Sequence, residues 1–140
     1  GCHGSEYFQL KREVGQRPPH SHTALGRAYL AALAEPRYSE MLRELKTHSP
    51  AKEWPQVREG IEQARSDYSR YGFVFSLGDW RPEVYAAGVT LTSPDGSRVY
   101  ALSCSGSAAL MTRKRLIQQI GPRLVAIRDE SYALAGGRRD

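Results

Sequence analysis

Tyr100-Ala101-Leu102-Ser103-Cys104-Ser105-Gly106 is the stretch that decides the fold of this 140-residue chain. Alternation along a strand predicts that Ser103 and Ser105 face one side of a sheet and that Leu102 and Cys104 face the other. Two hydroxyls at the end of a strand, just before a glycine, suit a small polar ligand better than a packed core. The stretch therefore predicts a strand with a ligand-binding end.

Other segments read as strands of the same sheet. Residues 84–92 predict a long strand, and residues 97–104 predict the strand that returns beside it. Ser93-Pro94-Asp95-Gly96 between them has the residue types of a tight turn. Residues 73–77 predict a further strand, and residues 7–14 alternate apolar and polar side chains as a half-buried strand does.

Helices are predicted from apolar residues at three- to four-residue spacing. Their expected starts are Ser21 or Thr23, Arg37, Pro55 and the residue after Thr112. Gly121-Pro122 is expected to kink or break the last helix. The order of one strand, three helices, three strands and a helix favours an α+β fold in which helices pack on a sheet.

The net charge of +5 raises the question of nucleic-acid binding. Most of the excess lies after residue 112, in Arg113-Lys114-Arg115 and Arg138-Arg139. A basic cluster at a helix start opposes the helix dipole, so it does not serve helix stability. We interpret it as a solvated face, with a phosphate or acidic-partner contact as the alternative. Direct DNA reading by these residues is not expected, because no recognition-helix pattern is present.

Cysteine usage and hydropathy indicate the compartment. Cys2 and Cys104 are too few for a disulfide framework and lack zinc-ligand spacing, which favours a cytoplasmic protein. No segment predicts a membrane span or a signal peptide. No cofactor is predicted. His20 and His22 lie two residues apart, but nothing local supplies a third metal ligand, so whether they bind metal stays open.

Two sets of hydrogen-bond donors are candidates for a site. One is the hydroxyl pair of Ser103 and Ser105, and the other is the first-turn amides around Ala24, Leu25 and Gly26. These amides carry partial positive charge, and the small side chains let an anion reach them. The alternatives are a solvated sheet face and a plain capped helix. Together the two sets predict a module that senses a small carboxylate.

An enzyme is not expected. Ser105-Gly106 lacks the glycine that a nucleophile turn has two residues before its serine, because Ser103 stands there. Cys104 and the histidines match a nucleophile and base only in composition. Asp79 and Glu83 flank Trp80-Arg81, where an arginine–carboxylate pair is more typical of structure than of chemistry. A small serine or cysteine hydrolase remains the less favoured alternative.

Several segments together resemble the effector-binding domain of IclR-type transcriptional regulators. In chain order they are Val14-Gly15-Gln16-Arg17-Pro18-Pro19, residues 23–33, Tyr71-Gly72-Phe73, residues 78–84, and residues 101–106 followed by Leu110-Met111-Thr112. The resemblance runs from about Tyr7 to Leu134. It implies an α+β, GAF-like fold: a curved antiparallel sheet with helices on its faces and a pocket for a small metabolite.

The resemblance also implies how the chain is organised. Residues 7–135 would be the effector-binding domain, residues 1–6 a frayed or truncated start, and residues 136–140 a disordered tail. Family members place a winged helix-turn-helix domain before this one and bind DNA as dimers or tetramers. We therefore expect a small-molecule effector, self-association to a dimer or tetramer, DNA contact only through a domain missing from this chain, and no membrane partner. A ligand-free GAF-like interaction or dimerisation module is the alternative.

Carried over by position, the resemblance implies a set of effector-binding residues. Donors would be Ala24, Leu25, Ser103 and Ser105, and the walls would be Tyr7, Leu10, Pro18, Ser76, Pro82 and Val84. Ser76 falls near a position that is often acidic in the family, and Glu83-Val84 stands where an Arg-Cys pair is usual. These departures remove polar groups, which favours an effector with more apolar area, such as an aromatic or branched carboxylate.

Overall fold

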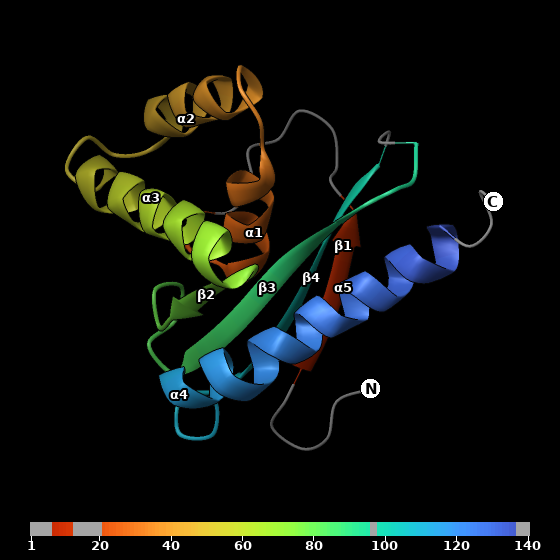
Figure 1. Cartoon of the computed structure of the whole chain (residues 1–140). Coiled ribbons are helices and arrows are strands. Elements are labelled where there is room, and N and C mark those ends of the chain that lie inside the picture. Colours follow the sequence, from red (N-terminus) through yellow and green to blue (C-terminus); the bar gives the residue numbers. More distant parts are fainter. Residues whose placement is uncertain (1–6, 13–20, 96–97, 137–140) are drawn as a thin grey trace.

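The computed structural model describes residues 7–12, 21–95 and 98–136. Its elements are β1 (Tyr7–Arg12), α1 (Ala24–Ala32), α2 (Arg37–His48), α3 (Trp54–Tyr71), β2 (Val74–Leu77), β3 (Val84–Thr92), β4 (Val99–Ser107), α4 (Arg113–Arg115), the π-helical η1 (Leu116–Ile120) and α5 (Gly121–Gly136). Within the described residues the strands form one sheet in the order β1-β4-β3-β2 (Figure 1). The predicted α+β fold is confirmed.

Every pair of neighbouring strands in this sheet is antiparallel. The predicted hairpin is β3–β4, in which Ala86 pairs with Ser105 and Gly88 pairs with Ser103. At its turn the Ser93 amide donates to the Arg98 carbonyl at 2.8 Å. β1 pairs with the other side of β4, so the serine strand lies inside the sheet between the hairpin partner and the N-terminal strand.

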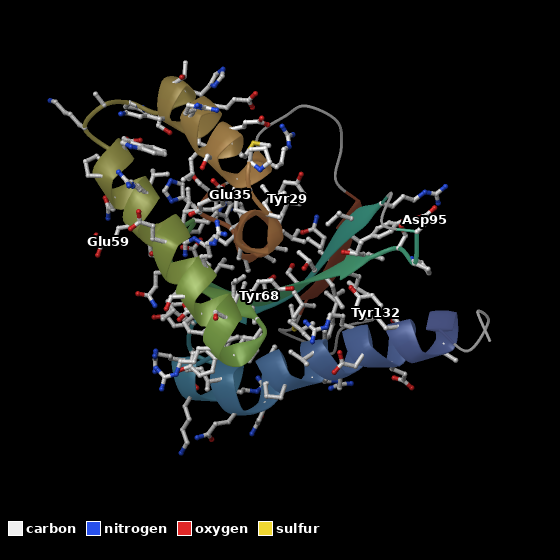
Figure 2. All side chains as sticks on the ribbon, turned by 45° about the horizontal axis from the view of Figure 1, so that its top comes forward. Tyr29, Glu35, Glu59, Tyr68, Asp95 and Tyr132 are labelled. Carbon is white, nitrogen blue, oxygen red and sulfur yellow. The ribbon has the colours of Figure 1, made fainter. Side chains whose placement is uncertain are left out.

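Helices cover both faces of the sheet. α1 lies on one face with α3 outside it, and α4, η1 and α5 cross the other face (Figure 1). The α5 side has an apolar core that includes Phe73, Ala87 and Cys104. On the α1 side Tyr68 of α3 reaches Thr90 of β3, with their hydroxyl oxygens 2.7 Å apart (Figure 2). Of the described helices, none is both long and apolar enough to cross a membrane.

Capping residues begin and end the helices as their chemistry predicts. Thr23 is the N-cap of α1, and its Oγ1 accepts from the Gly26 amide at 3.1 Å. Pro55 lies in the first turn of α3, and Gly72 ends that helix with φ of 84°, a left-handed conformation that favours glycine. Thr112 caps the last helix through the Arg115 amide.

The last helix is not broken at Gly121-Pro122. Helical elements follow one another without a gap from Arg113 to Gly136, and the Gly121 amide bonds the Leu116 carbonyl in a π turn. Proline has no N–H and its ring crowds the preceding turn, which a wide π turn accommodates. Gly121 also faces the ring of Phe73, where a Cβ would overlap the ring atoms. Glycine here lets the helix approach the sheet.

Some predicted features lie outside the described residues. These are the frayed start at residues 1–6, the end of the first strand at residues 13–14, part of the hairpin turn, and residues 137–140 of the tail. The returning strand is longer than predicted, since β4 continues through Gly106 to Ser107. The glycine therefore lies within the strand rather than at its end.

Gly88 marks the place where α1 lies on the sheet. A Cβ at this position would be 2.8 Å from the Ala24 carbonyl oxygen, which belongs to backbone and cannot swing away. We expect Gly88→Ala to lower the free energy of unfolding by about 1–3 kcal/mol. The control is Thr92→Ala, at the exposed end of the same strand, which should change stability by no more than about 0.5 kcal/mol. Urea denaturation measures both, and equal midpoints for the two variants would contradict the close approach.

Candidate functional site

The first turn of α1 lies directly over β3, the strand next to β4, which carries Ser103 and Ser105. The Ala24 carbonyl occupies the space above Gly88, and Gly88 pairs with Ser103 of β4. Figure 2 shows α1 end-on, between α3 and the sheet. The helix start that carries the predicted amides thus lies over the strand next to the serines, although about eighty residues of sequence separate the two segments.

The two serines share the α1 face of the sheet but differ in burial. Ser103 is only 5% exposed, and Ser105 is half-buried. Among the described residues neither side-chain hydroxyl has a hydrogen-bond partner. No fully enclosed side-chain nitrogen or oxygen in the described part of the chain lacks a partner. The Ser103 oxygen is therefore not fully enclosed in the core.

The α1 amides supply the second set of donors. The Thr23 side chain satisfies the Gly26 amide, and the Thr23 carbonyl accepts from the Arg27 amide at 2.9 Å. The amides of Ala24 and Leu25 have no carbonyl one turn earlier in the helix to bond. No acidic residue stands in this first turn. The helix end therefore presents two donors and the positive end of its dipole without a local anion.

Ser76 is used for structure rather than left free. It is 3% exposed, and its Oγ donates to the His22 carbonyl at 2.8 Å. Ser76 pairs with Ala86 on β3, and Ala86 pairs with Ser105 on β4. Ser76 therefore lies two strands from Ser105 in the sheet. From there its hydrogen bond to His22 fixes the segment that leads into α1.

Three further predicted wall residues lie near the ends of the strands. Tyr7 pairs with Ser105 across the β1–β4 ladder. Val84 pairs with Ser107 and is half-buried. Pro82 is exposed in the loop between β2 and β3. The backbone register thus puts Tyr7 and Val84 toward the Ser105 end of β4.

Leu10 is not brought to the site. It pairs with Leu102, which packs against the core on the α5 side, and Leu10 itself is 61% exposed. Positions 7 and 10 of one strand are an odd number of residues apart, so they face opposite sides of the sheet. Leu10 therefore lies across the sheet from Ser103. The other predicted wall residue, Pro18, lies outside the described residues.

Arg27 is a functional candidate that the sequence reasoning did not single out. It is 6% exposed, its Nε donates to the Ser21 carbonyl at 3.0 Å, and its Nη1 donates to Asp79 Oδ2 at 2.6 Å. Asp79 therefore pairs across the fold rather than with its neighbour Arg81, whose guanidinium lies 4.5 Å from the centre of the Trp80 ring. The only signal in the sequence is a charged residue within a helix of small and apolar residues.

Asp67 is a second buried charge near this end of the fold. It lies on α3, is 7% exposed, and accepts from Gln63 Nε2 at 3.0 Å. Burial raises the pKa of the Asp67 carboxyl above its ordinary value of 3.8, while the Gln63 hydrogen bond and then Arg113 oppose that change.

Two other kinds of site, a ligand hollow and a metal centre, can be judged on the described surface. A hollow of about 380 Å³ lies along α2, away from the serine strand, and is lined by Arg37, Glu40, Arg43, Glu44, Thr47 and His48. All six residues come from one helix, and none is among the predicted site residues. In the part of the chain that the structure describes, no group of three His, Cys, Asp or Glu is placed to hold a metal ion. His20 lies outside that part.

Comparisons with known proteins agree on one family. A family model described as "Bacterial transcriptional regulator IclR C-terminal" matches residues 3–132. A search of curated proteins found no match. Among solved structures, an IclR family transcriptional regulator from Brucella abortus is 29% identical with a TM-score of 0.78, and the match covers 89% of this chain and 46% of that one.

Two more distant structures show the same fold. The IclR of Thermotoga maritima is 18% identical, with a TM-score of 0.68 over 95% of this chain and 62% of that one. The inducer-binding domain of the transcription factor PobR from Acinetobacter, a double mutant in complex with 3-hydroxybenzoic acid, is 19% identical, with a TM-score of 0.59 over 79% of this chain and 63% of that one. The chain thus spans about half the length of the Brucella abortus protein.

The buried Asp67 predicts a pH dependence of stability. Because its folded pKa is raised above 3.8, ionisation disfavours the fold, and stability is lost as the pH rises from 3.8 through the folded pKa. Asp67→Asn removes this titration. We expect the variant to gain stability relative to the wild type as the pH rises, with the smallest gain below pH 3.8. Urea midpoints over a pH series measure the difference.

The control for this series is Thr92→Ala, because it replaces an exposed side chain that does not titrate. Its difference from the wild type should stay nearly constant over the same pH series. A difference between Asp67→Asn and the wild type that shrank with rising pH would contradict the assignment of burial as the cause.

Proposed function

This chain belongs to the IclR family of bacterial transcriptional regulators, whose C-terminal domain it carries, and from that premise we propose that it senses a small carboxylate effector. The observation that supports the proposal is the close approach of the first turn of α1, whose Ala24 carbonyl lies over Gly88, to the strand pair that carries the nearly buried, unpartnered Ser103 hydroxyl. Each group can donate to a carboxylate oxygen. Donors that converge on one carboxylate would give the anion several partners at once.

The donors suit a carboxylate for electrostatic reasons. Hydrogen bonds to an ionised acceptor are shorter and stronger than those between neutral groups. The positive end of the α1 dipole adds roughly 0.3–2 kcal/mol for an anion placed at the first turn. The nearby Arg27 charge is already offset by Asp79 at 2.6 Å. The amides and hydroxyls, not a free cation, would therefore hold the effector.

The floor of the site favours an apolar body on the effector. Ala86 and Gly88 lie between α1 and the serines, and both are buried. We propose that the amides of Ala24 and Leu25 and the hydroxyls of Ser103 and Ser105 hold the carboxylate. Tyr7, Pro82, Val84 and the undescribed Pro18 would then lie around its body. An aromatic or branched carboxylate fits this floor of small residues better than a two- or three-carbon acid.

The setting of this function is also proposed by analogy with the family. The domain would act in the cytoplasm, associate to a dimer or tetramer, and reach DNA only through a separate winged helix-turn-helix domain. The ligand-free interaction module expects both serines to be solvent-exposed. Ser103 is 5% exposed, which argues against that alternative.

A carboxylate should raise the melting temperature of the domain. We expect 3-hydroxybenzoate, as the probe, to stabilise the wild type by RT ln(1 + [L]/Kd), about 2.7 kcal/mol at a hundred times Kd. Ser103→Ala should raise Kd about tenfold, because one hydrogen bond to a charged group is lost. Differential scanning fluorimetry over a concentration series measures both quantities.

Ser107→Ala is the matched control, since Ser107 is an exposed serine on the same strand. It should respond to the probe as the wild type does. The uncharged amide of the same probe should give a much smaller shift. If a panel of aromatic and branched carboxylates left the folded wild type unshifted, the proposal would be wrong.

A further inference from the structure

Arg27 is buried in contact with three separate elements. Its Nε bonds the Ser21 carbonyl before α1, and its Nη1 bonds Asp79 in the β2–β3 loop. A Cβ at Gly60 of α3 would lie 2.6 Å from Arg27 Nη2, so that glycine makes room for the guanidinium. A buried cation is costly unless it is paired and hydrogen-bonded, and here the partners come from both sides.

The contacts of Arg27 fix the segment that leads into α1, which we call the strap (residues 21–23). The carbonyl of Ser21 accepts from Arg27 Nε, and the carbonyl of His22 accepts from Ser76 Oγ. The carbonyl of Thr23 accepts from the Arg27 amide. All three strap carbonyls are therefore held by donors of this chain.

Holding the carbonyls also sets the direction of the amides. A trans peptide is planar, so its N–H points opposite to its carbonyl. The Thr23 carbonyl points along α1 toward the Arg27 amide. The Ala24 N–H therefore points the opposite way, out of the helix N-terminus. The direction of the Ala24 amide is thus set by the bond made to the Thr23 carbonyl of the strap.

We propose that Arg27 and Asp79 form a latch that positions the α1 amides for the effector, an inference that rests on the proposed function. Neither residue needs to touch the ligand. Asp79 holds the guanidinium from the β2–β3 loop, the guanidinium holds Ser21, and the strap orients Ala24 and Leu25. Arg27 and Asp79 are positioning residues for a site on the other side of the strap.

Substitution of Asp79 distinguishes a positioning role from a purely electrostatic effect of its charge on a bound anion. Loss of a negative charge near the site would by itself tighten the binding of an anion. The latch predicts the opposite: Asp79→Ala raises the Kd for 3-hydroxybenzoate about tenfold, the loss expected when a charge-assisted hydrogen bond is misaligned. Asp79→Asn keeps an acceptor for Arg27 and should lie between Ala and the wild type. Isothermal titration calorimetry measures all three.

A ligand-free measurement tests the latch independently. In 15N–1H correlation spectra of the free protein, Asp79→Ala should shift the Ala24 and Leu25 amide resonances. Glu62→Gln is the control, because it breaks the exposed Arg58–Glu62 ion pair on α3 and should leave both resonances in place. Unchanged Ala24 and Leu25 resonances in folded Asp79→Ala would overturn the latch.

Gly60→Ala keeps the test open if Asp79→Ala does not fold. Alanine favours the α3 helix more than glycine does, so the fold should be retained. Its Cβ would displace the Arg27 guanidinium from the other side. We expect the same two amides to shift and the Kd to rise, and unaltered values for both would overturn the proposal.

The outcomes of these experiments test the latch separately from the proposed function, carboxylate binding, on which it rests. If the wild type binds the probe, Ser103→Ala binds it more weakly, and the Asp79 variants bind it as the wild type does or more tightly, the latch is wrong and the effector site stands. If the wild type binds no carboxylate, yet Asp79→Ala shifts the two amides, the latch orients the helix end and the proposed function is wrong.

Discussion

The structure depends on the close approach of α1 to β3 at Gly88. The Ala24 carbonyl lies where a side chain at position 88 would have to be. This contact brings backbone, not side chains, to the middle of the sheet, because both surfaces are made of small residues. In the proposed site a ligand would then meet the main-chain amides of α1 and the hydroxyls of the adjoining strand, with little apolar bulk between them.

Electrostatics at the site come from oriented dipoles rather than from a free charge. The nearest buried cation, Arg27, is compensated by Asp79, and the first turn of α1 carries no acidic residue. A carboxylate would therefore be held by amides and hydroxyls whose strength depends strongly on direction. A charge acts over several ångströms in any direction, but an amide that points the wrong way forms almost no hydrogen bond. The bonds that hold the strap carbonyls consequently matter for recognition as well as for stability.

Local patterns in the sequence predicted what depends on local chemistry. The caps Thr23, Thr112 and Gly72, the β3–β4 hairpin and the shared face of the serines follow from spacing and turn residues. The resemblance implied Leu10 for the same site as Ser103, but strand alternation puts Leu10 on the opposite face of the sheet from the serines. The Arg27–Asp79 pair joins residues 52 positions apart, and no local pattern encodes such a partner. The π turn likewise reflects both Pro122 and the Phe73 ring below Gly121.

Ser76 shows how one substitution changes both the strap and the ligand. An acidic residue, which is common near this position in the family, accepts hydrogen bonds when ionised and cannot donate to the His22 carbonyl. Serine donates to that carbonyl at 2.8 Å and so ties the strap to β2. It also removes a negative charge from the neighbourhood of a bound carboxylate. In the proposed site, with Ala86 and Gly88 as the floor, discrimination between effectors would then depend on the shape of their apolar part.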